Sequence, residues 1–409
     1  MDFNDTAEEA AYRKQAREWL DKNATRKSEA GSVEMGSTLD ELIAMSKAWQ
    51  AKKAEAGYAC ITWPKEWGGG GGTTVQNVIY GQEEAKYAVP GSIFAIGLGM
   101  CIPTVMAWGP DDAKERYVRP AVRGDEIWCQ LFSEPAGGSD VAGLRTRAER
   151  DGDEWVINGQ KVWTSGAHFC DFGIVLVRTD PSVPKHKGLT MFYIDMKSPG
   201  VEVRPIRQMS GDAHFNEVFF TDVRVKDSQR LGKEGEGWKV ALTTLMNERL
   251  AVGGSQGNAD VAELIALARD TEVADGPAIA NGAVRERIAD WYVQAQGLKF
   301  TKFRTLTALS KGETPGPESS ISKIVAAKKM QDLGSFGMDL QDMGGIIRDR
   351  KISPEEGAYT EQWLGAAGYR IAGGTDEILR NIVAERVLGM PQDVRVDKEL
   401  PFNQAPKGK

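Results

Sequence analysis

Histidine and cysteine are scarce in this chain, with three histidines and four cysteines among 409 residues. No two histidines stand at HxxxH spacing, and no two cysteines form a CxxC pair. Because zinc and di-iron centres need such clustered ligands, we expect no metal site. We expect the scattered cysteines to be free thiols in packed positions rather than a disulfide framework. They are Cys60, Cys101, Cys129 and Cys170.

Long apolar runs are also missing. No stretch of about 18 apolar residues occurs, so no membrane span is expected. The first residues are acidic and then amphipathic, without the basic stretch and apolar block of a secretory signal, and the expected location is cytoplasmic. The net charge of −7 argues against a general affinity for nucleic acid, although a local group of cations could still bind an anionic ligand.

What is present is typical of a folded globular protein, with 41% apolar and 27% charged residues. At 409 residues the chain is expected to form two or three domains. Helical patterns broken by glycine and proline fill residues 1–126, short β-prone runs fill 127–235, and long helical patterns fill 236–409. This order predicts an α+β multidomain fold.

The middle region predicts strands at 154–163, 173–178, 189–195, 201–205 and 216–225. Within the first of these, the step Asn158-Gly159 between two β-prone runs predicts a hairpin turn. The pattern contains no crossover helices between these strands. It therefore favours an antiparallel barrel or sandwich over a dinucleotide-binding βαβ unit.

The flanking regions predict helices at 39–57, 238–252, 259–269, 284–309, 319–341, 359–364 and 375–388, with a break at Pro315-Gly316-Pro317. Five consecutive glycines, Gly68 to Gly72, follow the segment Trp63-Pro64-Lys65-Glu66-Trp67. Such a run could cradle a phosphate, but no GKS or GKT sequence accompanies it. A turn that uses the conformational freedom of glycine is the favoured interpretation.

A second glycine-rich turn follows a predicted strand in the segment from Gln130 to Asp140, QLFSEPAGGSD. Backbone N–H groups beside Gly137 and Gly138, with the Ser139 hydroxyl, could bind a pyrophosphate or the oxygens of a ring. On these residues alone, a purely structural turn is an equal alternative.

Together with other segments, this turn resembles the acyl-CoA dehydrogenase family from about Trp63 to Pro391. The matching stretches are FSEPAGGSD (132–140), WVINGQKVWTS (155–165), RTD (178–180), NEVFFTDVRV (216–225), GWKVALTTLMNERL (237–250) and GGTDEILRNIVAERVLGMP (373–391). The resemblance implies an N-terminal helical domain (1–126), a central antiparallel β-barrel (127–235) and a C-terminal four-helix bundle (236–409). It also implies FAD at their junction and α,β-dehydrogenation of an acyl-CoA thioester.

The same resemblance implies cofactor-binding residues in the middle region. Gln130 and Phe132 would present backbone groups to the isoalloxazine ring, and Ser133 would hydrogen-bond the flavin near N5. Ser139, which follows Gly138, would lie by the cofactor pyrophosphate or the CoA thioester arm, which makes it a substrate-binding candidate as well.

Two further contacts to the ring are implied at Trp163, which would pack against it, and Ser165, which would hydrogen-bond it on the side opposite the substrate. The alternative for Trp163 is an ordinary aromatic residue of the barrel core. In the C-terminal region the segment 341–345 resembles the family's QxxGG, where a neighbouring subunit touches the adenine end of FAD. The cofactor candidates there are Gln341, Gly344, Gly345, Thr375 and Glu377.

The catalytic base is the remaining requirement, because removing a weakly acidic Cα proton needs a carboxylate in a dry pocket. Many family members place this glutamate just before a Gly-Thr pair, where this chain has Gly373. A second subset carries it on the first bundle helix in an ERL context, which Asn247-Glu248-Arg249-Leu250 matches. The resemblance therefore implies Glu248 as the base and places Arg249 near the CoA pantetheine. A structural ion pair is the alternative for both.

Gly373 remains a catalytic candidate, because its backbone N–H could bind the thioester carbonyl and stabilise the enolate-like charge. Its lack of a carboxylate also leaves open a base-less subunit that supports a heteromeric enzyme. A flavin oxidase or monooxygenase on the same fold is the other alternative.

Because family members with the base on the first bundle helix act on branched, long or bulky acyl groups, the resemblance implies a branched or bulky acyl-CoA as substrate, such as one with a steroid side chain or a dicarboxylic acyl group. Candidates for lining its pocket are Phe94, Ile96, Leu98 and Met100. By resemblance, the expected acceptor is an electron-transferring flavoprotein, and the expected assembly is a homo- or heterotetramer.

Overall fold

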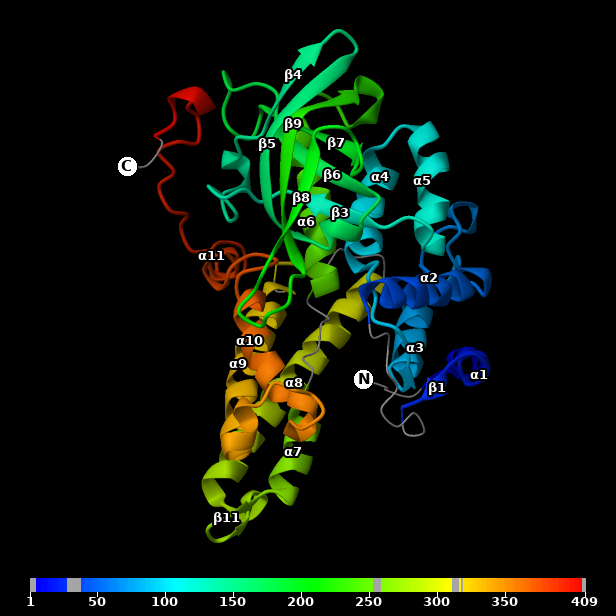
Figure 1. Ribbon diagram of the computed structural model, residues 1–409, viewed down its shortest axis with the longest axis vertical. Coiled ribbons are helices and arrows are strands. Elements are labelled where there is room, and N and C mark those ends of the chain that lie inside the picture. The colour runs from blue at the N-terminus through cyan, green and yellow to red at the C-terminus, as the bar shows by residue number, and fades with distance from the viewer. Residues whose placement is uncertain (1–4, 28–37, 253–258, 311–315, 318, 407–409) are drawn as a thin grey trace. The chain divides into compact units, whose positions relative to one another are not determined.

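The computed structural model describes residues 5–27, 38–252, 259–310, 316–317 and 319–406 (Figure 1). The chain forms two compact units. Unit 1 comprises residues 1–206, 213–247 and 395–409, and unit 2 comprises residues 207–212 and 248–394. The three-domain boundaries expected after residues 126 and 235 stay a prediction.

The described part of unit 1 begins with the α-helices α1 (Ala7–Asn23), α2 (Leu39–Glu55), α3 (Thr74–Glu84), α4 (Ile102–Trp108) and α5 (Asp111–Arg123). Capping boxes start the first three, with Thr6, Thr38 and Thr73 each accepting a backbone N–H of the first turn. The helix predicted at 39–57 is confirmed by α2. Two short strands, β1 (Thr25–Arg26) after α1 and β2 (Tyr87–Ala88) after α3, pair in antiparallel fashion.

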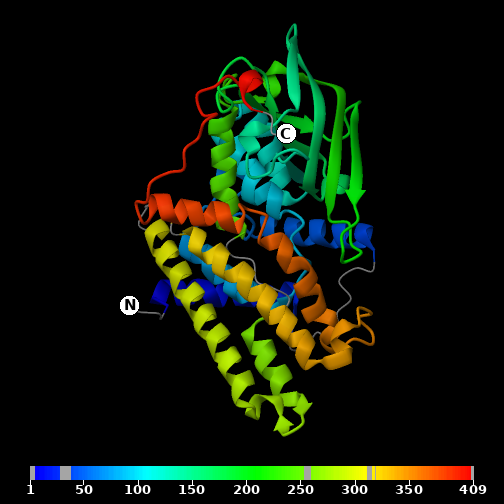
Figure 2. The same cartoon turned by 90° about the vertical axis from the view of Figure 1, so that its left-hand side faces the viewer.

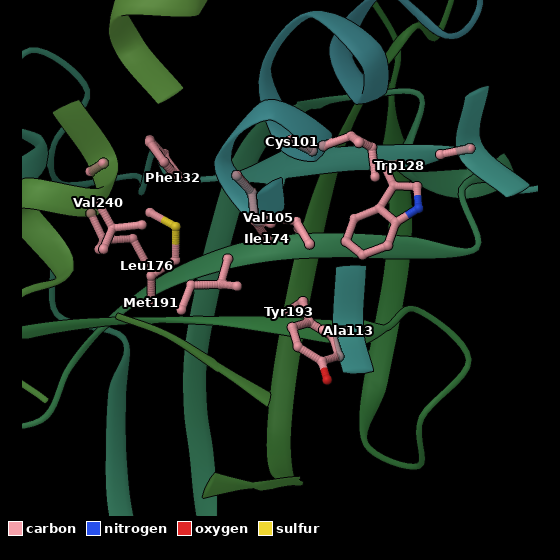
Figure 3. Packing of buried hydrophobic residues seen from close by; sticks show 14 of the residues in the cluster. Cys101, Val105, Ala113, Trp128, Phe132, Ile174, Leu176, Met191, Tyr193 and Val240 are labelled. Atoms are coloured by element: carbon pink, nitrogen blue, oxygen red, sulfur yellow. The ribbon is translucent and has the colours of Figure 1, made fainter. Parts of the chain in front are cut away.

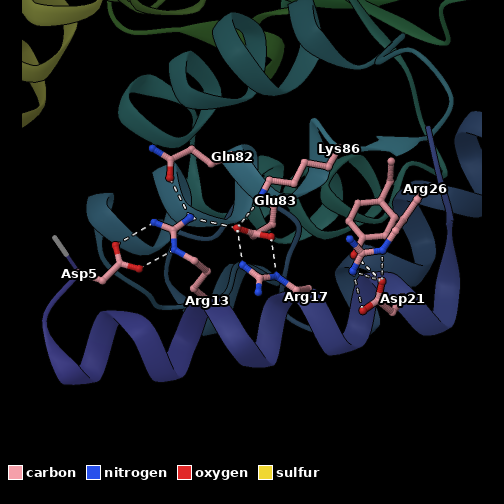
Figure 4. Close-up of polar contacts among 9 residues, drawn as sticks. Asp5, Arg13, Arg17, Asp21, Arg26, Gln82, Glu83 and Lys86 are labelled. Carbon is pink, nitrogen blue, oxygen red and sulfur yellow. Dashed lines mark hydrogen bonds and ion pairs between the residues drawn. The ribbon is translucent and has the colours of Figure 1, made fainter. Parts of the chain in front are cut away.

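A buried carboxylate joins α1 to α3 (Figure 4). The Glu83 side chain on α3 accepts from Arg17 Nε at 3.0 Å, from Arg13 Nη1 at 3.1 Å and from Lys86 Nζ at 2.8 Å. Burial alone would raise the pKa of Glu83, but the three cations together lower it to about 2. The charge of Glu83 is thus compensated by two arginines of α1 and by a lysine that follows α3.

One eight-stranded sheet dominates the rest of unit 1. Its strands are β3 (Trp128–Leu131), β4 (Arg147–Asp151), β5 (Glu154–Ser165), β6 (Phe172–Arg178), β7 (Leu189–Asp195), β8 (Val201–Ile206), β9 (Phe215–Lys226) and β10 (Arg230–Leu231). They follow the order β10-β7-β6-β4-β5-β9-β8, with β3 beside β6. The strand-rich middle is confirmed, but its expected purely antiparallel pairing is corrected, because β3 and β4 pair with β6 in parallel.

The hairpin predicted at Asn158-Gly159 is wrong, because β5 runs straight through it as one strand. The Asn158 amide instead donates to Asp222 Oδ1 of β9 at 3.0 Å, and a register shift follows at Gly159. A Cβ on Gly159 would lie 2.6 Å from Thr146 Oγ1, so close strand approach explains the glycine. The real turn joins β4 to β5 at Gly152, whose φ is +67°.

Strands β6 and β7 are buried on both faces, and their side chains contribute to two hydrophobic cores. Ile174, Leu176 and Met191 pack with Cys101 and Val105 of the α4 region, as Figure 3 shows. The alternate residues pack into a second core on the other face; they include Val175, Val177, Phe192 and Ile194. This two-residue alternation is the geometry of a central strand covered on both sides.

Unit 2 is helical. It contains the end of α6 (Gly237–Val252), followed by α7 (Val261–Asp270), α8 (Gly282–Ser310), α9 (Ser319–Leu340), α10 (Ala358–Tyr369) and α11 (Asp376–Arg386), and a small pair β11 (Glu272–Val273) with β12 (Gly276–Pro277). The predicted helices are confirmed, and α10 runs five residues beyond the expected Leu364. Gly337 of α9 lies so close to α10 that a Cβ there would overlap the Tyr359 ring.

The five-glycine segment forms a turn, as favoured. Its amides from Gly69 to Gly72 donate to backbone carbonyls of residues 60–64. These N–H groups are therefore not free to bind a phosphate, which would first have to displace the carbonyl acceptors. The four cysteines are free, and Cys101, Cys129 and Cys170 are buried. Among the described residues, no helix is long and apolar enough to cross a membrane.

Candidate functional site

The turn after β3 is held by a buried ion pair. Lys161 of β5 donates from Nζ to Glu134 Oε1 at 2.9 Å and to the Phe132 carbonyl at 3.0 Å. Glu134 also accepts the backbone N–H groups of Arg145 at 2.6 Å and Thr146 at 2.9 Å. These four hydrogen bonds fix the first half of the FSEPAGGSD segment.

The charges in this pair are shifted by burial and by each other. Burial lowers the pKa of Lys161 to about 8, against the opposing attraction of Glu134. Burial raises the pKa of Glu134, but Lys161 and the hydrogen bonds together hold it below its ordinary value. Removing either partner would leave the other as an uncompensated buried charge.

Ser133 and Gly138 lie at the open end of this turn. The Ser133 carbonyl accepts the Val162 N–H at 2.9 Å, so the turn is fastened directly to β5 beside Trp163. A Cβ on Gly138 would lie 3.9 Å from Ser133 Oγ, which brings these two candidates together. Ser139 follows and is exposed, whereas Gln130 lies inside β3 and is half-buried.

Trp163 is not a core residue, so the ordinary-core alternative is wrong. Its side chain is 58% exposed, although it stands on a central strand between the half-buried Val162 and the buried Thr164. Its φ is +60°, a left-handed conformation that is costly for a bulky residue. Thr164, the next residue, has a buried hydroxyl with no partner among the described residues. An exposed indole on strained backbone fits a planar ligand, and Ser165 is half-buried on the same strand.

In unit 2 the Gly373–Gly374 turn lies between α10 and α11. The two glycines have φ of +66° and +91°, a region that favours glycine. Lys323 of α9 donates from Nζ to the Gly374 carbonyl at 2.6 Å. Thr375 caps α11, its hydroxyl accepting the Ile378 N–H at 3.3 Å.

Lys323 also interacts electrostatically with Glu248. Burial lowers the pKa of Lys323 and Arg370 acts in the same direction, whereas Asp376, Glu248 and Glu377 oppose the shift. Glu248 itself is half-buried in α6, and Glu377 is exposed at the start of α11. Glu248 and the Gly373–Gly374 turn are thus each related to Lys323 of unit 2, the first by charge and the second by a hydrogen bond. The Arg249 side chain lies outside the described residues.

The QxxGG segment forms a 3-10 helix, η7 (Asp342–Ile346), after α9. The Gln341 Nε2 is buried and has no hydrogen-bond partner among the described residues. Gly344 and Gly345 have a packing role, because a Cβ would meet Pro354 at the first position and overlap the Met338 carbonyl at the second. An unsatisfied buried amide is a reason to expect a ligand contact at Gln341.

The cofactor candidates thus fall into two groups, one in each unit. FAD fits the first group through the exposed, strained Trp163 and the second through the orphaned Gln341 amide. Sequence reasoning missed Glu134, Lys161 and Lys323, which hold these groups in place. Glu134 and Lys161 stood inside the matched motifs, and their opposite charges were the available signal. Within the described residues, no group of three or more His, Cys, Asp or Glu could hold a metal ion.

Three family models match successive parts of the chain and together cover most of it. The acyl-CoA dehydrogenase N-terminal, middle and C-terminal domain models match residues 6–125, 129–223 and 235–388. The acyl-CoA dehydrogenase IpdE1 of Mycobacterium tuberculosis is 36% identical over 396 residues, which cover 94% of this chain and 98% of that protein. The chain spans about half the length, 48%, of a 37% identical relative, acyl-CoA dehydrogenase FadE34 of the same species.

Solved structures share the architecture. The complex named Tcur3481-Tcur3483 steroid ACAD has a TM-score of 0.80 and 25% identity, covering 96% of this chain and 100% of that chain. The ChsE4-ChsE5 complex from Mycobacterium tuberculosis, at 24% identity and a TM-score of 0.78, shows the same fold. The chain belongs to the acyl-CoA dehydrogenase family and is an FAD-dependent oxidoreductase.

Proposed function

We propose that Glu248 removes the Cα proton of an acyl-CoA thioester while a hydride leaves Cβ, giving a trans-2-enoyl-CoA. The observation that carries this proposal is the link through Lys323, which binds the Gly374 carbonyl and interacts electrostatically with Glu248. This shared link to Lys323 supports a proposed site that contains both the base candidate and the thioester-binding candidate Gly373. FAD, when bound, supplies the acceptor for the hydride.

Glu248 is favoured because position 373 is unsuited to a glutamate. A φ of +66° there would strain any side chain with a Cβ, so this turn is built for glycine. Glu248 is half-buried, and a carboxylate removed from water is a stronger base. The Gly373 N–H would donate to the thioester carbonyl and stabilise the negative charge that develops as the proton leaves.

The ring of the cofactor would be held by the two segments that Lys161 and Val162 fasten together. The proposed contacts are Gln130, Phe132 and Ser133 on one segment, with Gly138 and Ser139 at its phosphate end, and Trp163 and Ser165 on the other. Gln341, Gly344, Gly345, Thr375 and Glu377 are the proposed contacts in unit 2. Arg249 is proposed to lie near the CoA arm.

The proposed substrate is an acyl-CoA with a bulky or branched acyl group. One similar solved complex is named a steroid ACAD, which supports this substrate class. Two of the candidate lining residues, Leu98 and Met100, lie in a π-helix, η2 (Gly97–Cys101), and Phe94 and Ile96 precede it; such a distortion is often found at functional sites. Phe94 and Met100 are buried, and Ile96 and Leu98 are half-buried.

We further propose an electron-transferring flavoprotein as acceptor and an assembly with other chains. One relative of 26% identity is named as a subunit of a caffeyl-CoA reductase-Etf complex. Unit 2 exposes many large apolar side chains, which include Tyr292, Val293, Met343, Ile346, Ile352 and Ile371. Apolar exposure on this scale favours an interface with a copy or a related chain.

Substituting Glu248→Gln tests the base. The rate of enoyl-CoA formation with an artificial electron acceptor should fall by about 10²–10⁴-fold, because the amide cannot accept the proton. Bound FAD and the melting temperature should stay at wild-type values. Glu286→Gln, an exposed carboxylate on α8, is the matched control and should keep full activity.

The same measurements separate the alternatives. The lack of a carboxylate at Gly373 leaves open a base-less supporting subunit, and in that case Glu248→Gln would leave the activity of a reconstituted complex unchanged. An oxidase would reoxidise rapidly in air, whereas the dehydrogenase should transfer electrons faster to the flavoprotein than to oxygen. Near-normal turnover of the Glu248→Gln variant would refute the assignment.

A further inference from the structure

Residues 395–406, here named the C-terminal strap, return to unit 1 after the chain has completed unit 2. They lie beyond residue 388, where the match to the family's C-terminal domain ends. Figures 1 and 2 draw this segment in red beside the sheet-bearing unit. Its place in the structure is therefore not explained by the helical unit that precedes it.

The strap is docked through its backbone on the loop between β6 and β7. The Phe402 N–H donates to the Val183 carbonyl at 2.9 Å, and the Asn403 N–H donates to the Pro181 carbonyl at 3.0 Å. Pro401 forms an isolated bridge with Pro184. These bonds give the strap one register on the loop.

Two side chains then connect the strap to the phosphate end of the flavin motif. The first connection runs through Phe402, whose ring covers the Arg178 guanidinium with 3.5 Å from Cζ to the ring centroid. Arg178 donates to the Ala142 carbonyl at 2.6 Å and to the Leu144 carbonyl at 3.1 Å. Burial lowers the pKa of Arg178 to about 10, so the guanidinium is charged and its hydrogen bonds are charge-assisted at neutral pH.

The second connection runs through Lys185. Its ammonium is held between Asp397 of the strap at 2.6 Å and Asp140 of the GGSD turn at 3.0 Å. The Lys185 side chain is only 13% exposed, whereas the side chains of Asp397 and Asp140 are 31% and 59% exposed, so the ammonium is sheltered while Asp140 stays open to solvent. Lys185 neutralises Asp140, whose negative charge would otherwise repel a phosphate bound at the neighbouring Ser139.

Both connections end on residues 140–144, directly after Ser139. We propose that the C-terminal strap is a positioning element that holds the Gly138–Asp140 turn in shape to bind a phosphate-bearing ligand. The ligand is FAD through its pyrophosphate or acyl-CoA through its CoA arm. The inference rests on the role proposed for Ser139. Asp397 and Phe402 are positioning residues, since they act through Lys185 and Arg178.

The test compares the full chain with a variant that ends at Val394, and with Asp397→Asn and Phe402→Leu. The dissociation constant of FAD is measured by titrating apoprotein, and KM and kcat are measured with saturating FAD. Ending the chain at Val394 should raise the FAD dissociation constant or the KM for acyl-CoA about tenfold, with kcat within about twofold. Each point variant should raise the same constant about two- to fivefold, as expected for loss of one ion pair or one cation–π contact.

Controls keep the result specific to positioning. Lys398→Gln changes an exposed strap residue and should leave the FAD dissociation constant and the KM unchanged. Asp397→Glu keeps the carboxylate, so both constants should stay much closer to wild type than in Asp397→Asn. The constant that rises tells FAD from CoA as the ligand. If the shortened chain does not fold, the two point variants decide.

Unchanged FAD dissociation constant and KM in these variants would overturn the proposal, and so would a lower melting temperature with both constants unchanged. Failure of the proposed reaction is a separate result. In that case the wild-type chain would show no enoyl-CoA formation, while the FAD titrations would still report on the strap.

Discussion

Lys323 of α9 has three properties that bear on its role. It is buried, its charge is opposed by the loss of hydration, and its ammonium is committed to one backbone carbonyl, that of Gly374. A charge-assisted bond of this kind contributes about 1.5–3 kcal/mol. Its position next to Gly373 makes orientation of the thioester-binding turn its natural role.

We expect Lys323→Met to lower kcat/KM by about 10–100-fold, the loss equivalent to one such bond. Lys323→Arg should recover part of the activity, because it keeps the charge but changes the reach. Steady-state kinetics with acyl-CoA and a melting curve measure both effects. The matched control is Lys328→Met on the same helix, whose exposed partner Asp332 lies at i,i+4, and it should lose less than about twofold. A Lys323→Met enzyme with wild-type kcat/KM would contradict this role.

At the same scale, the sequence motifs located the candidate residues but not the residues that hold them. Lys161 and Glu134 are 27 residues apart, and Lys323 and Gly374 are 51 apart. Such pairs are created by strand order and helix packing, which periodicity does not encode. Trp163 shows the reverse case, since a core role was plausible from its strand position and only the fold revealed its exposure.

Elements were largely predictable, because apolar periodicity decides whether a segment forms a helix or a strand. The parallel pairing of β3 with β6 was not predictable, since it depends on partners about 44 residues apart along the chain. The Asn158-Gly159 step misled for a physical reason. Glycine is required both by turns and by close strand approach, and the local sequence does not distinguish the two.

Gly159 should therefore behave as a packing glycine. Gly159→Ala is expected to destabilise unit 1 by about 1–3 kcal/mol, because the new Cβ would press on Thr146 at 2.6–2.8 Å and the φ of +150° disfavours a side chain. Urea unfolding followed by tryptophan fluorescence measures the change. Gly81→Ala in α3 is the control, since nothing lies within 4 Å of its Cβ, and it should be neutral or stabilising by about 0.5–1 kcal/mol. Equal stabilities of the two variants would show that strand packing does not require Gly159.

For the whole molecule, the division into a sheet-bearing unit and a helical unit raises the question of what covers the helical one. Apolar side chains remain exposed along unit 2, with Met343 71% and Ile346 62% exposed on η7. These two residues flank Gly344 and Gly345 and follow the orphaned Gln341 amide. A single segment therefore joins exposed apolar side chains to a polar group that lacks a partner among the described residues.

We expect the wild-type chain at micromolar concentration to form an oligomer, and Ile346→Asp to shift it to a smaller species, because a charge placed in an apolar contact loses its hydration. A contact of hot-spot strength, at least about 2 kcal/mol, would weaken assembly about 30-fold. Light scattering on a sizing column measures the mass, and flavin absorbance of the same peak measures FAD retention. Ile346→Leu is the control and should keep both. If the chain alone runs as a monomer that loses FAD but regains it when a related chain is added, the assembly is heteromeric; a monomer that keeps FAD fully would show that Gln341 needs no second chain.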